Sequence, residues 1–316
     1  MTSLRILLTG ATGTAGRATL DALVAAGHVV VTLGRSDPGS GGDHRRCDIR
    51  DARSLREDGL RGQRFDAVVS CLASRSGAPQ DAWEIDYAAQ LNLLNAAEEA
   101  GIAQFVLLSA ICVQKPKLAF QEAKLAFEAA LERSEIVHSI VRPTAYFKSL
   151  SGQVERVRAG KPFLVFGDGQ LTACKPISDR DLGRFIASCV TDSDKRNAVL
   201  PIGGPGPAIT PMEQAQALCA ALGRPLRVRR VPVRMIDMIA AGLGLAGGLH
   251  KPWAQKAELA RIGRYYATES MLVWDAVRQC YDAAATPETG SDTLFDHYAA
   301  LAAGAAPEHL GAHRVF

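Results

Sequence analysis

Residues 4–16 read L-R-I-L-L-T-G-A-T-G-T-A-G, and this stretch decides the fold that the sequence predicts. Its apolar run ends in three glycines, and a helical pattern follows over residues 17–27. That order predicts a strand, a tight turn and a helix. Glycines in such a turn let the backbone approach a pyrophosphate, whose charge then lies at the N-terminus of the following helix.

The glycine spacing alone is weak evidence for a dinucleotide-binding turn, because 29 of the 316 residues are glycine and a G-x-x-G-x-x-G string can arise by chance. The strand before the turn and the helix after it are the context that a dinucleotide-binding turn requires. We therefore predict that this turn binds a dinucleotide. The expected contact residues are Gly10, Thr12, Gly13, Thr14 and Gly16.

The composition is that of an ordinary globular protein. Hydrophobic residues make up 47% of the chain and charged residues 22%, and the net charge of +3 does not indicate a nucleic-acid partner. A chain of 316 residues can form one large α/β domain, or a domain with a smaller appendage. Seven cysteines without C-x-x-C pairs fit reduced thiols in the cytoplasm and argue against a metal site.

Two expectations concern targeting and membranes. The first predicted strand begins at residue 4, so we expect neither a signal peptide nor a transit peptide. The apolar runs are too short or too interrupted to predict a spanning helix. The nearest approach is Met235–Leu249, which fits either a packed helix and loop or a segment at a membrane surface or substrate entrance.

Strands and helices alternate regularly through the first half of the chain. Apolar or β-branched runs predict further strands at 28–33, just before Cys47, and at 65–73, 104–110 and 136–141. Helices are expected over 83–100 and from Pro116, and the first of these has a core stripe of Tyr87, Leu91, Leu94 and Ala97. This alternation predicts an α/β fold, with a Rossmann-type parallel sheet flanked by helices.

The alternation loosens beyond residue 145, which predicts two regions. Residues 1–150 are expected to form an NAD(P)-binding Rossmann domain. Residues 151–316 are expected to form a smaller, mostly C-terminal substrate-binding region packed on it, with an approximate boundary that allows interleaving. In this region the sequence predicts capped helices after Ser178 and Thr210, a basic strand at Leu226–Val231, helices to Ala303 and a loose tail.

Four residues at predicted strand ends are expected to contact the dinucleotide. Arg35 follows the second strand, where an acid favours the ribose hydroxyl of NAD and an arginine favours the 2′-phosphate of NADPH, so it predicts NADPH. Asp48 fits either an adenine contact or a helix cap. Cys71 and Ser109 end later strands, at the edge where ligands bind in open α/β sheets.

Lys124 lies four residues after Phe120, in the string F-Q-E-A-K. Short-chain dehydrogenases have a tyrosine at the first of these positions, where the lysine lowers its pKa for proton transfer, and a phenylalanine cannot transfer a proton. Lys124 can still hold the nicotinamide ribose hydroxyls; the alternative is a surface lysine. Pro143, at the end of the sixth strand, is expected near the nicotinamide.

Aromatic and basic side chains follow the predicted cofactor fold. They suit the binding of a flat anionic ligand, because aromatic walls contact its faces and cations contact its charged groups. These predicted substrate contacts are Tyr146, Phe147, Lys148, Phe163 and Lys175.

Several strings resemble the divinyl chlorophyllide 8-vinyl reductase family, a branch of the atypical, NmrA-like short-chain dehydrogenase/reductases. They are S-C-L-A-S-R (70–75), L-L-S-A-I-C-V-Q-K-P (107–116), Y-F-K-S-L (146–150), G-D-G (167–169), C-K-P-I-S (174–178), Y-A-T-E-S-M-L (266–272) and T-P-E-T-G-S-D-T-L (286–294). The resemblance covers nearly the whole chain and is far more specific than the glycine turn.

This resemblance implies an NADPH-dependent reduction of the 8-vinyl group of divinyl chlorophyllide, or of its protochlorophyllide precursor, to an ethyl group. The substrate would be a Mg-tetrapyrrole, and the expected setting is the cytoplasm of a phototrophic bacterium, with peripheral membrane contact left open. Tyr146, Lys124 and solvent are the candidate proton sources, in that order. His138 and His250 are not expected to bind a metal, because a lone histidine is more often structural or exposed.

Two alternatives stay open at this point. A non-catalytic NADPH-binding regulator or assembly factor of the NmrA-like type would also tolerate the loss of the tyrosine, but it has no evident need for the aromatic and basic set at 146–148 and 174–176. Reduction of a small phenolic compound, as in isoflavone reductases, fits the fold but not these strings. The oligomeric state does not follow from the sequence.

Overall fold

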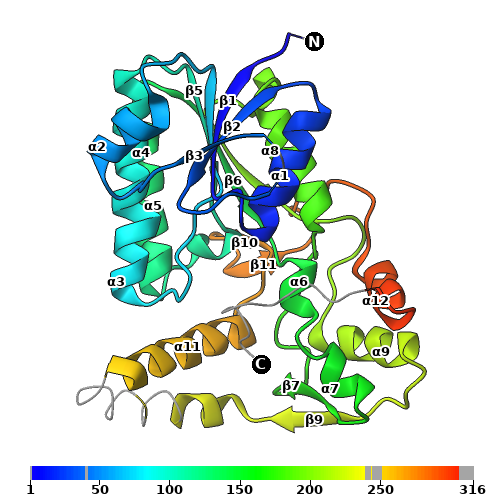
Figure 1. The fold of residues 1–316 in the computed structure, drawn as a ribbon. Helices are drawn as coiled ribbons and strands as arrows, with labels where there is room; N and C mark the ends of the chain where they lie inside the picture. The colour runs from blue at the N-terminus through cyan, green and yellow to red at the C-terminus, as the bar shows by residue number, and fades with distance from the viewer. Residues whose placement is uncertain (1, 40–41, 239–242, 244–250, 306–316) are drawn as a thin grey trace. The chain divides into compact units, whose positions relative to one another are not determined.

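A computed structural model describes residues 2–39, 42–238, 243 and 251–305, and the chain divides into two compact units (Figure 1). The first unit comprises Met1–Ser74, Pro79–Pro143 and Asp179–Pro201. The second comprises Arg75–Ala78, Thr144–Ser178 and Ile202–Phe316.

The first unit is built on a seven-stranded sheet, in the order β3-β2-β1-β4-β5-β6-β8. All pairs from β3 to β6 are parallel, which confirms the predicted Rossmann-type sheet. Since the chain order reverses between β1 and β4, the ligand-binding edge of such a sheet lies at the carboxyl ends of these two strands. The strands are β1 (Arg5–Thr9), β2 (Val29–Gly34), β3 (Asp43–Arg46), β4 (Ala67–Ser70), β5 (Gln104–Leu108), β6 (Val137–Pro143) and β8 (Ala198–Ile202).

Helices cover both faces of this sheet, with α4 and α5 on one face and α1 and α8 on the other (Figure 1). Because both faces are covered, the central strands β2, β4 and β5 are largely apolar rather than alternating. The helical elements are α1 (Thr14–Ala25), α2 (Ala52–Ser54), η1 (Leu55–Leu60), α3 (Pro79–Ala82), η2 (Trp83–Ala89), α4 (Gln90–Glu99), η3 (Ile111–Gln114), α5 (Ala119–Arg133), α8 (Asp179–Cys189) and η4 (Ser193–Lys195).

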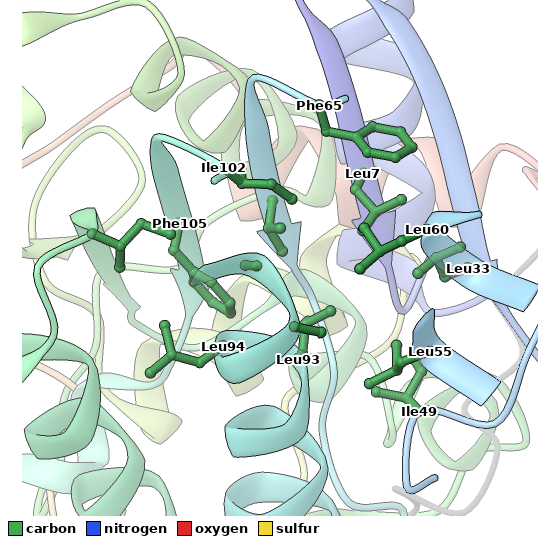
Figure 2. Close-up of a cluster of buried hydrophobic side chains, with 14 of the residues drawn as sticks. Leu7, Leu33, Ile49, Leu55, Leu60, Phe65, Leu93, Leu94, Ile102 and Phe105 are labelled. Carbon is green, nitrogen blue, oxygen red and sulfur yellow. The ribbon is translucent and has the colours of Figure 1, made fainter. Parts of the chain in front are cut away.

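The main hydrophobic core fills the space between the sheet and the helices of the α4 and α5 side. Figure 2 shows Phe105 of β5 near Leu93 and Leu94 of α4, and Leu33 of β2 beside Leu60 of η1, and all five side chains are buried. Burying one such side chain contributes about 1.5–3 kcal/mol. The core therefore fixes the strand register, and with it the edge where the strands end.

The segment predicted as one helix over 83–100 is helical, but its first part is the π-helix η2. The predicted stripe is confirmed as core: Leu94 and Ala97 are buried, and Tyr87 and Leu91 pack partly buried against them. Asp86 lies outside this apolar stripe and is buried as well. π-Helical turns occur frequently at functional sites.

Helix α8 packs against α1, although residues 179–201 come after the predicted domain boundary. Gly183 makes this contact: a Cβ atom there would lie 2.5 Å from the carbonyl oxygen of Ala18. The two helix backbones touch, so the chain returns to the first unit after 35 residues, Thr144–Ser178, in the second.

The second unit contains helices and two small sheets. Its elements are α6 (Phe147–Leu150), α7 (Val154–Arg158), β7 (Phe163–Phe166), α9 (Pro211–Ala221), β9 (Val228–Val231), α11 (Lys251–Thr268), β10 (Val273–Asp275), β11 (Cys280–Asp282) and α12 (Leu294–Ala302). The predicted basic strand is confirmed as β9, which pairs with β7, and Thr210 caps α9 as predicted.

The prediction of helices up to Ala303 is wrong for one segment. Strands β10 and β11 form an antiparallel hairpin in which the rings of Trp274 and Tyr281 lie 4.9 Å apart. Facing aromatic residues stabilise such a pair of strands, and the left-handed backbone of Gln279 (φ 54°) makes the turn.

Parts of two predicted segments lie outside the described residues: 239–242 and 244–249 of Met235–Leu249, and the tail from residue 306. Within the described part of the chain, every helix is too short or too polar to cross a bilayer.

Candidate active site

The glycine turn after β1 is shaped by close backbone contacts. Gly10 has φ +77°, and a Cβ atom there would lie 2.4 Å from the carbonyl oxygen of Cys71. A Cβ atom on Gly16 would lie 2.1 Å from the carbonyl oxygen of Gly10. Gly13 is the N-cap of α1, and the first turn of that helix carries no acidic residue. The backbone N–H groups of this turn therefore fit a phosphate.

Arg35 lies exposed directly after β2, near Asp48. The Asp48 carboxylate accepts hydrogen bonds from Arg50, at 2.6 Å from Nη2, and these bonds together with the charge of Arg35 lower the pKa of Asp48 to about 2. The cap of α2 is Asp51, which accepts from the N–H of Arg53. The cap interpretation of Asp48 is therefore wrong, and its contact with adenine stays a prediction.

Lys124 is buried on α5, and its ammonium Nζ lies 2.9 Å from Oδ1 of Asp86 on η2. The same oxygen accepts the backbone N–H of Ser74, at 3.3 Å, in the segment after β4. The alternative of a surface lysine is wrong. A buried ammonium needs a partner of opposite charge, and Asp86 supplies it. Through Asp86, Lys124 is thus tied to the segment that follows β4.

Ser109, at the end of β5, has its hydroxyl in the protein interior rather than open to the edge. It donates a hydrogen bond to Oε1 of Glu128, and Glu128 also pairs with Arg142 of β6. Glu128 is buried on α5, one turn after Lys124. The triplet ties β5, α5 and β6 together. A direct contact of Ser109 with the dinucleotide stays a prediction.

Cys71 and Pro143 end β4 and β6 on the same edge. The carbonyl of Cys71 closes the glycine turn, and its thiol lies 3.8 Å from the hydroxyl of Thr19, to which it donates. Burial raises the pKa of Cys71 to about 12, so the thiol is neutral at physiological pH. Pro143 is buried at the end of β6.

The predicted substrate residues all belong to the second unit and differ in their surroundings. Tyr146 is the half-buried N-cap residue of α6, and Lys148, two residues later, is half-buried as well. Phe147 is buried and packs on His297, with ring centroids 5.4 Å apart, and Phe163 is buried in β7. The apolar character of both phenylalanines is thus explained by packing, without a ligand.

Lys175, the last of the predicted substrate contacts, already has partners within the protein. It is buried, and its Nζ pairs with the carboxylate of Glu288 and lies 3.2 Å from the carbonyl oxygen of Thr286. The same contact lowers the pKa of Glu288. A buried ammonium needs such a partner, so Lys175 fastens the segment after β11. Contact of Lys175 with a substrate stays a prediction.

Three acidic residues, Asp86, Glu128 and Glu288, were missed by the sequence analysis. A signal exists for one of them, because Glu128 lies four residues after Lys124, so that both face the same side of α5. Asp86 sits among apolar residues of a helix and gives no such signal.

The two histidines of the sequence analysis are not expected to bind a metal. His138 is buried on β6, where its backbone N–H donates to the side-chain oxygen of Asn197, and His250 lies outside the described residues.

Residues 10–193 match a protein family described as NAD(P)H-binding, which agrees with the glycine turn and the parallel sheet. A solved structure of an NADPH-dependent quinone oxidoreductase from Escherichia coli has the same fold, with a TM-score of 0.67 over 94% of this chain and 99% of that chain, at 19% sequence identity.

The divinyl chlorophyllide a 8-vinyl-reductase of Oryza sativa subsp. indica is 44% identical to this chain over 331 residues, which cover 98% of this chain and 82% of that protein. The chain belongs to the divinyl chlorophyllide 8-vinyl-reductase family. A photosystem II assembly factor of Synechocystis is a more distant relative, with 26% identity over 74% of this chain and 72% of that protein.

For this member of the reductase family we predict that Glu128→Ala lowers the free energy of unfolding by about 3 kcal/mol, because breaking a buried ion pair leaves the partner charge uncompensated. Urea titration measures this change. Glu132→Ala, at an exposed position one turn later on α5, is the matched control, with an expected change within about 0.5 kcal/mol. Equal losses in the two variants would contradict the buried role of Glu128.

Proposed function

We propose that the protein reduces the 8-vinyl group of a divinyl chlorophyllide, or of the corresponding protochlorophyllide, to an ethyl group with NADPH. The observation that carries this proposal is the 44% identity with a reductase of that name over 98% of the chain. The glycine turn, Arg35 and the buried Lys124 support the cofactor part of the proposal.

The chemistry suits a site without the usual tyrosine. Bound NADPH supplies the hydride for one vinyl carbon, and a proton goes to the other carbon. In such a reduction the developing charge is spread over a conjugated macrocycle rather than localised on one oxygen. A phenol that stabilises an alkoxide is therefore not required, and Phe120, half-buried on α5, is compatible with the reaction.

We assign distinct roles to residues of the two units. In the first unit, the N-terminus of α1 holds the pyrophosphate and Lys124 orients the nicotinamide ribose. The second unit is the proposed substrate-binding region, in which Tyr146 donates the proton and Lys148 contacts the anionic side chain of the tetrapyrrole. Solvent and Lys124 are the alternative proton sources.

Incubation of the purified protein with NADPH and divinyl chlorophyllide tests the proposed reaction, since loss of the vinyl group shortens the conjugation and shifts the Soret band to the blue. Tyr146→Phe is expected to slow this change about ten-fold or more, if the phenol is a general acid. Full activity of that variant would remove Tyr146 as the donor. An absent Soret shift, aerobically and anaerobically and with NADPH binding intact, would favour a non-catalytic NADPH-binding protein.

The choice of NADPH over NADH is predicted to depend on Arg35. We expect Arg35→Glu to lower the ratio of NADPH to NADH affinity by about ten-fold or more, because a carboxylate repels the 2′-phosphate. Fluorescence titration with both cofactors measures this ratio. Arg133→Glu, an exposed arginine at the end of α5, makes the same change in net charge and should leave the ratio unaltered.

We also propose that the protein is cytoplasmic and that its residues 224–238 contact an anionic membrane surface. Five arginines lie between residues 224 and 234, and Leu226 and Met238 expose apolar side chains beside them, a combination that favours interfacial binding. Arg229→Glu with Arg230→Glu should reduce sedimentation with vesicles containing phosphatidylglycerol. The control pair Arg64→Glu with Arg133→Glu should not. Equal sedimentation of the two double variants would contradict this surface.

A further inference from the structure

We propose that Asp86 is a second binding residue for the nicotinamide half of the dinucleotide: its Oδ1 holds the Lys124 ammonium, and its Oδ2 accepts a hydrogen bond from a ribose hydroxyl. This inference rests on the proposed NADPH site. Asp86 adds a carboxylate acceptor beside the lysine donor, and the two side chains together can bind both hydroxyl groups of the ribose.

The first argument is the unequal use of the two carboxylate oxygens. Oδ1 has two donors, Lys124 Nζ at 2.9 Å and the N–H of Ser74 at 3.3 Å. Oδ2 is buried and has no hydrogen-bond partner among the described residues. A buried carboxylate oxygen without a donor is costly, and such atoms in native proteins are usually completed by a ligand or a water molecule.

The neighbouring polar groups are satisfied, which makes Asp86 an exception. Thr9, at the end of β1, donates to Ser70 at the end of β4, with 3.0 Å between their hydroxyl oxygens. Ser70 in turn donates to the side-chain oxygen of Gln90, at 2.8 Å. Gln90 lies one turn after Asp86, so the same helical segment is anchored by a complete network and still leaves Oδ2 unused.

The position of Asp86 along the sheet edge indicates which half of the dinucleotide it would contact, namely the nicotinamide half. Arg35 follows β2, on one side of β1, whereas Asp86 binds Ser74, which follows β4 on the other side of β1. The glycine turn after β1 lies between them, and its Gly10 packs against Cys71. A dinucleotide with its pyrophosphate at this turn and its 2′-phosphate at Arg35 therefore has its nicotinamide ribose on the side of Asp86.

Lys124 alone cannot fix the orientation of the ribose hydroxyl groups. An ammonium supplies only donors, and a ribose diol needs both a donor and an acceptor to fix its orientation. The carboxylate of Asp86 supplies the acceptor at hydrogen-bonding distance from the ammonium. We expect the Lys124–Asp86 pair to recognise the hydroxyl groups of the ribose and not the charge of the phosphates.

Two ligands test this inference on the intact protein by fluorescence and calorimetric titration. NADPH contains the nicotinamide ribose, and adenosine 2′,5′-bisphosphate lacks it but keeps the 2′-phosphate. Asp86→Asn is expected to weaken NADPH binding about ten-fold or more, by loss of a charge-assisted acceptor, and to leave the bisphosphate within about two-fold. Glu258→Gln, a buried and ion-paired acid of the second unit, is the matched control and should change neither affinity.

The outcomes separate this inference from the proposed function. Wild-type protein that binds neither ligand would overturn the NADPH site itself. Wild-type protein that binds both, with an unchanged NADPH affinity in Asp86→Asn or with both affinities lowered alike, would overturn only the role of Asp86. If Asp86→Asn does not fold, wild-type protein is titrated with NADPH analogues that lack one hydroxyl of the nicotinamide ribose, and affinities equal to that of NADPH overturn the inference.

Discussion

The close approach of backbone segments at the glycine turn is the constraint on which the site depends. The carbonyl oxygen of Gly10 lies where a Cβ of Gly16 would stand, and Cys71 occupies the corresponding place beside Gly10. This packing joins the ends of β1 and β4 and directs the start of α1 toward the same edge. The phosphate-binding N–H groups and the segment after β4 are consequently fixed relative to each other by backbone alone, without relying on side-chain rotamers.

Buried charge adds the second layer of order. Lys124 and Arg142 come from neighbouring elements of the first unit, and each is compensated by an acid, Asp86 or Glu128. Such pairs contribute specificity of position more than net stability, because desolvation offsets most of the attraction. Glu128 uses both carboxylate oxygens within the protein, whereas Asp86 uses one. That difference marks Asp86 as part of a binding site and Glu128 as part of its frame.

The fold was predictable from the sequence because strand runs, glycine positions and helix periodicity are local signals, and β1 to β6 appear where these signals place them. The site was predictable only in part. Lys124 carries a family pattern, but its partner Asp86 is set by tertiary packing of a π-helical turn. The partner of Lys175 was missed for the same reason, since its ion pair with Glu288 joins residues far apart in the sequence. Burial and pairing of charges are long-range properties that one sequence does not encode locally.

The central claim is that a dinucleotide lies across this edge, with its nicotinamide ribose at Lys124 and Asp86. A crystal structure of the protein with NADP+ bound tests it most directly. The account predicts the 2′-phosphate at Arg35, the pyrophosphate at the first turn of α1, and one ribose hydroxyl within hydrogen-bonding distance of each member of the Lys124–Asp86 pair. A dinucleotide whose nicotinamide ribose contacts neither side chain would contradict it.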